Sequence, residues 1–316
     1  MTTYVVRRLL DLVFVLFGVS VLIFMMLRLI PGDAVAIMLG ANIDITPERV
    51  EALRQQLGLH LPLHQQYAQW LGGVLQGDLG RSVWTGRPVA DEILGRLPVT
   101  LQLSAMALTF SIVAAFPLGI VAARARGGHA DTLVRVTSIV GLTVPSFWIG
   151  VLLLYATSTY LPAWPTIGYV AFGQDPVGNL LRMALPTFAV ALPMIASLTR
   201  ILRSSLLDVL SLDYIRTAKA KGLASRSLFY KHALRNAMIP VITVIGVQVG
   251  YLLSGVVVIE QVFAIPGLGR LVIGAINERN YPLAQGVILV TTVVFVFVNL
   301  FVDLAYAWID PRVEYS

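Results

Sequence analysis

The 316-residue sequence contains no cysteine, and only 13% of its residues are charged. The absence of cysteine excludes disulfides, thiolate chemistry and metal sites built from cysteine ligands. The low charge excludes an ordinary soluble domain, in which about 25% of residues are charged. In place of charge the chain has 57% hydrophobic residues and a mean hydropathy of +0.80. The composition therefore predicts an integral membrane protein.

No glycine is followed by lysine anywhere in the sequence. A Walker A loop needs Gly-Lys-Ser or Gly-Lys-Thr, because that lysine and the backbone N–H groups of the loop hold the phosphates. If ATP and Mg²⁺ drive this protein, another chain must bind them. The histidines at helical spacing, His60 and His64, lack the glutamate of a metalloprotease helix, so neither a metal site nor a cofactor is predicted in this chain.

Six apolar stretches are long enough to cross a membrane as helices. Each has roughly twenty residues or more, the length that a helix needs to cross about 30 Å of hydrocarbon. The stretches begin near Leu9, Val99, Val134, Met183, Ile239 and Ala284. The loops expected between them are 31–98, 124–133, 162–181, 204–238 and 264–283. The predicted fold is all-α, with six transmembrane helices.

The distribution of basic residues predicts the orientation. Fourteen of the 23 Lys and Arg residues lie near the two termini and in or beside the loops 124–133 and 204–238. Positive charge in short loops marks the cytoplasmic side, and long loops contribute little to orientation. Both termini and the loop 204–238 are therefore expected in the cytoplasm. The net charge of +6 follows from the same rule, so nucleic acid is not an expected partner.

The middles of the apolar stretches are almost free of ionisable side chains. Asp11, Arg200, Glu260 and Asp303 all lie towards the ends of their stretches. Ion-coupled transporters and pumps usually place carboxylates or histidines near the middle of the membrane, because only a functional role sustains the cost of burying charge there. The sequence therefore disfavours a transporter that powers itself.

Polar, proline and small residues in the spans favour packing. Polar residues such as Ser146, Ser197 and Gln248 are individually expected to form hydrogen bonds between helices. Several spans also contain or adjoin a proline, which suits either a pathway that opens and closes or ordinary packing. The small residues Gly246, Gly250 and Ser254 recur every four residues on one face of the fifth span. We predict that this face packs within the chain or against a paired subunit.

The long first loop has some predicted order of its own. Thr46-Pro47-Glu48-Arg49 has the N-cap and proline of a helix start, which predicts a helix through about Leu57, ended by Gly58. Gly77-Asp-Leu-Gly80 predicts a turn.

The segment from Asp213 to Gly222 is a short, basic, helix-prone sequence between two long apolar stretches. Asp213 is expected to cap the helix, and Gly222 to end it in a left-handed conformation. Because no lipid covers a loop helix, its Ile and Ala face is expected to be covered by another protein. Ser225 is expected to begin a second helix that continues through Pro240 into the fifth span.

This loop resembles the cytoplasmic loop of permease subunits in binding-protein-dependent ABC importers. The resemblance rests on Tyr214-Ile-Arg-Thr-Ala-Lys-Ala-Lys-Gly-Leu223 and on His232-Ala-Leu-Arg-Asn-Ala237. The resemblance is greatest with the first-permease type of the dipeptide and oligopeptide group. The wider importer pattern has Glu-Ala-Ala where this chain has Arg216, Thr217 and Ala218, and the peptide group departs from that pattern in the same way. Other similar stretches are Pro31-Gly-Asp33, Pro145-Ser-Phe-Trp148, Pro266-Gly-Leu-Gly269 and Asp310-Pro-Arg312.

The resemblance implies a domain organisation. An N-terminal transmembrane helix (1–30) and an extracytoplasmic loop region (31–97) would precede a type I ABC importer transmembrane domain (98–308), and a cytoplasmic tail (309–316) would follow it. The loop 204–238 would couple the domain to an ATPase. The coupling residues implied are Asp213, Tyr214, Ile215, Arg216, Thr217, Ala218, Lys219, Ala220, Lys221 and Gly222.

The resemblance also implies a function and a set of partners. The chain would be a non-catalytic subunit in the bacterial cytoplasmic membrane, forming half of the pathway of an importer for dipeptides or short oligopeptides. Its partners would be a second homologous permease, two ATPase subunits that bind ATP and Mg²⁺, an extracytoplasmic substrate-binding protein, and membrane lipid. The same machine could carry a nickel chelate, glutathione or another small solute, and no substrate-binding residue is identified. A channel or an intramembrane enzyme is the alternative from a different class, opposed by the absence of catalytic or selectivity motifs.

Overall fold

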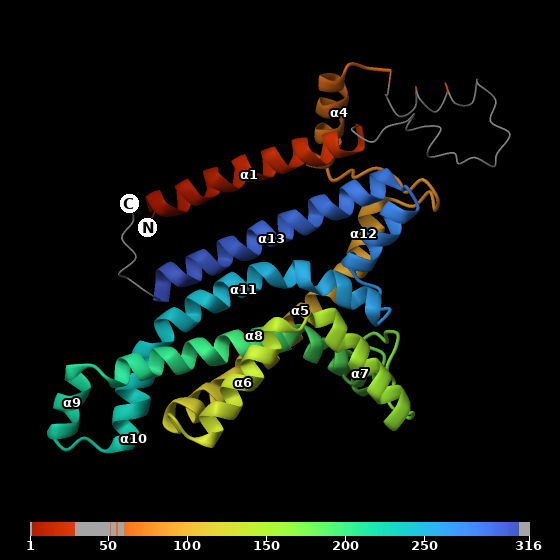
Figure 1. Ribbon diagram of the computed structural model, residues 1–316. Coiled ribbons are helices and arrows are strands. Elements are labelled where there is room, and N and C mark those ends of the chain that lie inside the picture. The colour runs from red at the N-terminus through yellow and green to blue at the C-terminus, as the bar shows by residue number, and fades with distance from the viewer. Residues whose placement is uncertain (1, 29–50, 52–54, 56–59, 310–316) are drawn as a thin grey trace. The chain divides into compact units, whose positions relative to one another are not determined.

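The computed structural model describes residues 2–28, 51, 55 and 60–309, and most of these residues lie in helices (Figure 1). No strand forms within these residues, so the predicted all-α class is confirmed. The helices are α1 (Thr2–Arg28), α4 (Leu63–Leu75), α5 (Val89–Arg124), α6 (His129–Thr143), α7 (Ser146–Tyr160), α8 (Pro176–Leu210), α9 (Asp213–Ala220), α10 (Ser225–Ser227), the π-helix η1 (Leu228–Leu234), α11 (Arg235–Val262), α12 (Leu268–Asn277) and α13 (Tyr281–Ile309).

Apolar helices lie at each of the six predicted span positions. Four described stretches are long and apolar enough to cross a membrane, namely α5, α8, Ser225–Gly250 and Tyr281–Val302. The pair α6 and α7 passes the same test when taken together as a fifth. The first predicted span falls on α1, of which Leu10–Met26 is an apolar helix.

The third predicted span is not one helix. The chain bends by 104° between α6 and α7. Val144 there has an extended backbone, with φ −82° and ψ 125°. The ring of Pro145 disfavours the helical conformation in the residue before it, and Pro145 has no N–H to continue the hydrogen-bond ladder. The stretch predicted to span from near Val134 therefore consists of two helices, and a single continuous helix does not form there.

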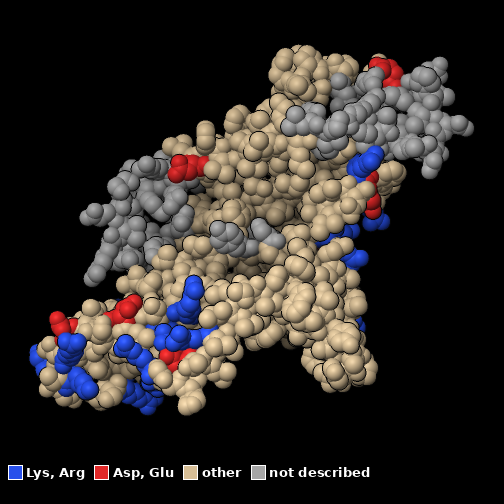
Figure 2. All heavy atoms as spheres, viewed as in Figure 1, with Lys and Arg blue, Asp and Glu red and all other residues tan. Residues whose placement is uncertain are grey.

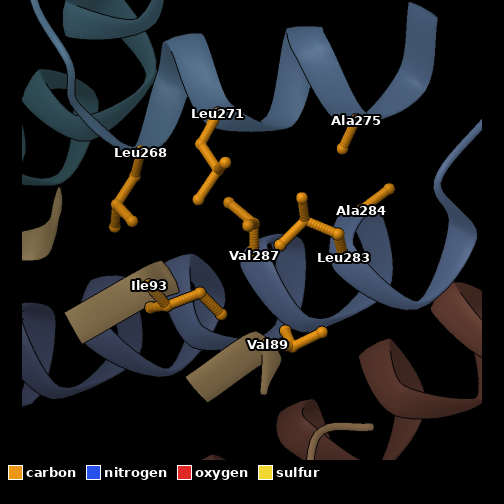
Figure 3. Close-up of a cluster of buried hydrophobic side chains, with 8 residues drawn as sticks. All are labelled: Val89, Ile93, Leu268, Leu271, Ala275, Leu283, Ala284 and Val287. Atoms are coloured by element: carbon orange, nitrogen blue, oxygen red, sulfur yellow. The ribbon is translucent and has the colours of Figure 1, made fainter. Parts of the chain in front are cut away.

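The described chain divides into two compact units, residues 1–99 with 267–297 and residues 100–266 with 298–316. In the first unit, the start of α5 packs with α12 and the start of α13. Leu271 of α12 points towards Val287 of α13, and Val89 and Ile93 of α5 complete the cluster (Figure 3). Helix α12 lies within the predicted loop 264–283, so the expectation of a plain loop there was wrong. The burial of its Leu271 and Ala275 explains why it forms a helix.

Hydrogen bonds fix the loop that precedes α5 to the connection between α12 and α13. Asn280 donates to the Ser82 hydroxyl at 2.7 Å, and Trp84 Nε1 donates to the Glu278 carbonyl at 2.8 Å. The turn predicted at Gly77–Gly80 is confirmed, because both glycines have a positive φ and Asp78 accepts a hydrogen bond from the Gly80 N–H. The helix predicted for residues 46–57 lies outside the described residues, apart from two isolated positions.

In the second unit, α8 is the central helix, in contact with α6, α7 and α11. Glycines allow its neighbours to approach closely. A Cβ at Gly119 of α5 would lie 3.0 Å from Leu202, and one at Gly141 of α6 would lie 3.0 Å from Ala196. Small residues at such crossings are how membrane helices gain packing contacts. Consistent with this central position, 61% of the most apolar stretch of α8 is buried, a larger share than in any other span found among the described residues.

Candidate functional site

Residues Asp213–Leu234 form a compact projection, which we call the basic hairpin. Helix α9 runs outward, the chain reverses near Gly222, and α10 and η1 return beside it (Figure 1). Its Lys and Arg side chains are exposed, and Figure 2 shows them gathered over α9 and α10.

The end of α9 is set by Gly222. This glycine has φ +82°, its N–H donates to the Lys219 carbonyl, and the Leu223 N–H donates to the Ala218 carbonyl at 3.3 Å. These two bonds form a Schellman motif, in which a left-handed residue satisfies the last carbonyls of a helix. The predicted left-handed end at Gly222 is confirmed.

The start of α9 differs from the prediction. Leu212 is the N-cap residue, and Asp213 is the first residue of the helix, with no capping hydrogen bond from a side chain. The Leu212 carbonyl already accepts from the Ile215 N–H at 3.0 Å, which places the helix boundary one residue earlier than expected. The Asp213 carboxylate still favours the helix, because negative charge is stabilising at a helix N-terminus.

The apolar face of α9 is covered by the chain itself. Ile215 is only 4% exposed and packs against Leu228 and Ala233, with Ala218 beside them. The expectation that another protein covers the Ile and Ala face was therefore wrong. Because the chain reverses at Gly222, the apolar residues of η1 come back over α9. The parts of α9 left to solvent are mostly polar, and a small hydrophobic core holds the hairpin together.

The return segment contains a feature that the sequence did not predict. The helix expected from Ser225 through Pro240 is continuous, but its residues Leu228–Leu234 form a π-helix. Such π-turns are rare and occur frequently at functional sites. The Asn236 amide just beyond η1 donates to the Tyr214 hydroxyl at 2.7 Å, and this bond joins α9 to the start of α11.

A second contact joins the hairpin to α5. The Arg124 guanidinium lies over the Phe229 ring, 4.3 Å from its centroid, and 5.3 Å from the centroid of Tyr230. Phe229 itself is buried. Stacking of this kind links the last residue of α5 to the π-helix of the hairpin.

A buried ion pair lies beside this region. Asp131 of α6 is 1% exposed and accepts two hydrogen bonds from Arg203 of α8, at 2.5 and 2.7 Å. The Gly127 N–H donates to the same carboxylate at 3.0 Å. A buried charge needs both a partner and further hydrogen bonds. The pair meets this need and fixes the turn before α6 to α8.

The small-residue face of α11 contacts α13 at one of its predicted positions. A Cβ at Gly246 would lie 2.5 Å from a methyl carbon of Val302, so only glycine fits there. Gly250 is buried, and the Ser254 side chain lies outside the described side chains.

The ten predicted coupling residues thus lie together on one structural element. Ile215 is buried, Ala218 is half-buried, and the remaining eight are exposed. This arrangement brings no nucleophile, base and oxyanion donor together, which is what covalent catalysis needs. It instead presents an exposed basic helix on a fixed base, and such an element is suited to docking against another protein.

Comparisons with known proteins agree with this description. The family model described as "Binding-protein-dependent transport system inner membrane component" matches residues 115–315, and the N-terminal model of such membrane components matches residues 1–104. A probable peptide ABC transporter permease protein of Sinorhizobium fredii is 41% identical over 315 residues, covering all of both chains. A putative peptide transport system permease protein of Brucella abortus is 41% identical over 316 residues, and a glutathione transport system permease protein of Escherichia coli is 40% identical over 316, each covering all of both chains.

Proposed function

Because the chain belongs to the family of inner membrane components of binding-protein-dependent transport systems, we propose that it forms half of the translocation pathway of an ATP-driven importer for dipeptides or short oligopeptides. Membership makes it a multi-pass inner membrane protein and one subunit of a transporter complex. Its relatives are transport permeases, not enzymes.

The basic hairpin is the observation that carries the proposal. Its core of Ile215, Leu228 and Ala233 makes it a stiff element, and its contacts through Arg124 and Asn236 connect it to α5 and α11. A stiff element connected to two spanning helices can pass a movement of its partner into the membrane. The hairpin therefore docks on an ATPase subunit, with Arg216, Lys219 and Lys221 facing that partner.

Membership of this family supports the proposal of further subunits, and the lack of a Gly-Lys dipeptide supports the binding of ATP by another chain. ATP and Mg²⁺ bind to two ATPase subunits, a second homologous permease supplies the other half of the pathway, and an extracytoplasmic binding protein delivers the cargo. Both termini and the hairpin face the cytoplasm, in agreement with the positive-inside rule. This chain holds no cofactor of its own.

Glutathione is a second candidate cargo. The Escherichia coli relative at 40% identity is a glutathione permease, and glutathione is itself a short peptide. Both cargoes use the same pathway and the same hairpin.

The absence of cysteine allows a direct test of the hairpin's partner. The variant Ala220→Cys places a single thiol on the exposed face of α9, where a maleimide photocrosslinker can be attached. In the assembled transporter, we expect this thiol to crosslink to an ATPase subunit, and we expect proteoliposomes to take up a dipeptide only when ATP and all subunits are present.

The matched control is Thr85→Cys, which is also exposed but precedes α5. It should give no crosslink to the ATPase. Equal crosslinking from the two positions, or photolabelling of the purified chain by an ATP analogue, would contradict the proposal.

A further inference from the structure

A cavity of about 420 Å³ lies among α6, α7, α8 and α11 in the second unit. It is lined on one side by Leu142 and Ser146, which flank the bend between α6 and α7. Pro193 and Gln248, which also line it, lie near the middle of α8 and of α11. The cavity therefore lies at mid-length of the spans. Its size falls within the range of about 300–1,000 Å³ typical of small-molecule sites.

Polar residues line this cavity, and no charged side chain lines it among the residues that the structure describes. The polar residues Ser146, Ser197 and Gln248 are among those that line it. The Gln248 Oε1 is buried and has no hydrogen-bond partner. An unsatisfied polar group at membrane depth is costly, so this oxygen needs a donor that none of the described residues supplies.

The backbone around the cavity is also incomplete. Pro193 has no N–H, so the Ala189 carbonyl lacks its helical donor. Helix α6 ends at Thr143, and α7 begins at Ser146 after the 104° bend. Non-helical backbone inside a membrane is tolerated only where it is buried in protein or lines a polar cavity. The break between α6 and α7 and the unpaired amide oxygen of Gln248 both belong to residues at this cavity, and together they indicate a site for an occupant that carries hydrogen-bond donors.

We propose that this cavity is a contact site for the transported peptide, in which Gln248 Oε1 accepts a hydrogen bond from a peptide N–H. This inference rests on the proposed function and adds the place of contact. Because the wall is uncharged and largely apolar, it accommodates peptide backbone and small or apolar side chains. It cannot form an ion pair with a charged peptide terminus, and weak contact of this kind allows the cargo to leave.

Cysteine protection tests the proposal in the complete transporter reconstituted in liposomes, with trialanine as the probe. The variant Ser197→Cys places the only thiol of the chain on the cavity wall. We expect a hydrophilic methanethiosulfonate reagent to modify it, and trialanine with ATP and the binding protein to slow that modification severalfold. Gly18→Cys, in the apolar part of α1, should show no protection.

A filling variant gives a second measurement. Gly255 lines the cavity, and a Cβ at this position would meet no atom within 4 Å, so Gly255→Phe can enter the open space. We expect trialanine uptake to fall about tenfold or more, since the variant occupies the contact volume of the cargo. Gly18→Phe is the matched control, because Gly18 is also helical with open space around its Cβ, and its uptake should equal that of the unaltered protein.

The outcomes separate this inference from the proposed function. If the unaltered transporter takes up neither trialanine nor glutathione, the proposed function itself fails. If uptake is normal but trialanine does not protect Ser197→Cys, the cavity holds only water, and the inference is overturned. Modification by an apolar maleimide alone would identify lipid as the occupant, with the same consequence. Normal uptake by Gly255→Phe would also overturn it.

Discussion

The turn between α5 and α6 (Ala125–Gly128) and the basic hairpin reverse the chain in the same way but are held by different forces. Each contains a left-handed glycine, Gly127 with φ +77° and Gly222 with φ +82°. In both cases a Cβ on the glycine would meet no atom within 4 Å. The local backbone chemistry of the two turns is therefore closely matched.

Their charged residues differ. The α5–α6 turn is attached to α8 by Asp131, which is buried and paired with Arg203. In the hairpin, the pair between Asp213 and Arg216 is open to solvent, with side chains 95% and 75% exposed and atoms 3.4 Å apart. The first turn is thus held in place by a buried charge on α6, the helix that follows it. The hairpin is held by hydrophobic contacts and leaves its charge available to a partner.

Breaking the two ion pairs should separate these roles most strongly. Arg203→Met leaves the Asp131 carboxylate buried without its cation, which should lower the free energy of unfolding by about 3–5 kcal/mol. Arg216→Met removes only an exposed pair and should lower it by no more than about 1 kcal/mol. Denaturant titration of the purified chain in detergent measures both values.

The double variant Asp131→Leu/Arg203→Met is the control for the buried pair. It removes both charges, so it should be more stable than Arg203→Met alone. If Arg203→Met and Arg216→Met lowered the free energy of unfolding equally, the ion pair of the α5–α6 turn would be no more important for stability than the exposed pair of the hairpin, which would contradict the distinction.

A matched substitution of the two glycines should give equal strain but different consequences. A β-branched residue in the left-handed conformation costs about 1–2 kcal/mol at either position. We expect Gly222→Val to uncouple ATP hydrolysis from uptake while the subunits still assemble. Gly127→Val should lower stability by a similar amount and leave the ATP hydrolysed per peptide unchanged. The ATP hydrolysed per peptide taken up can be measured for both variants in proteoliposomes.

Asparagine provides the graded control, because it adopts the left-handed conformation more readily than valine. Gly222→Asn should recover part of the coupling. If Gly127→Val uncouples transport as strongly as Gly222→Val, then the hairpin has no special part in coupling.

Features fixed by neighbouring residues could be predicted from the sequence. The Gly222 turn depends on the conformational freedom of one residue, and the apolar spans depend on composition over a single segment. The position of the basic helix could be predicted for the same reason. Its boundary was misplaced by one residue, because Leu212 adopts the extended N-cap conformation without a polar side chain.

Features that depend on distant residues could not be predicted. Asp131 and Arg203 are 72 residues apart, so no local pattern indicates that they pair. The burial of Ile215 requires the return of η1, and nothing in Leu228–Leu234 marks a π-helix. Pro145 was visible as an interruption, but the 104° bend and the cavity beside it arise from packing against α8 and α11.

The smallest expected effect concerns the residue that joins the two turns. Arg124 ends α5 just before the first turn, and its guanidinium stacks on Phe229 of the hairpin at 4.3 Å. Arg124→Lys keeps the charge but loses the planar group, at a cost of about 0.5–1 kcal/mol for an exposed stack. If movement of the hairpin reaches α5 through this contact, the ATP hydrolysed per peptide should rise about two- to fivefold, which is that energy expressed as a ratio.

Arg126→Lys is the matched control, since Arg126 is exposed in the turn that follows α5, and it should leave the ATP hydrolysed per peptide unchanged. Equal ratios for the two variants would mean that the hairpin acts through α11 alone, by way of η1 and the bond between Asn236 and Tyr214.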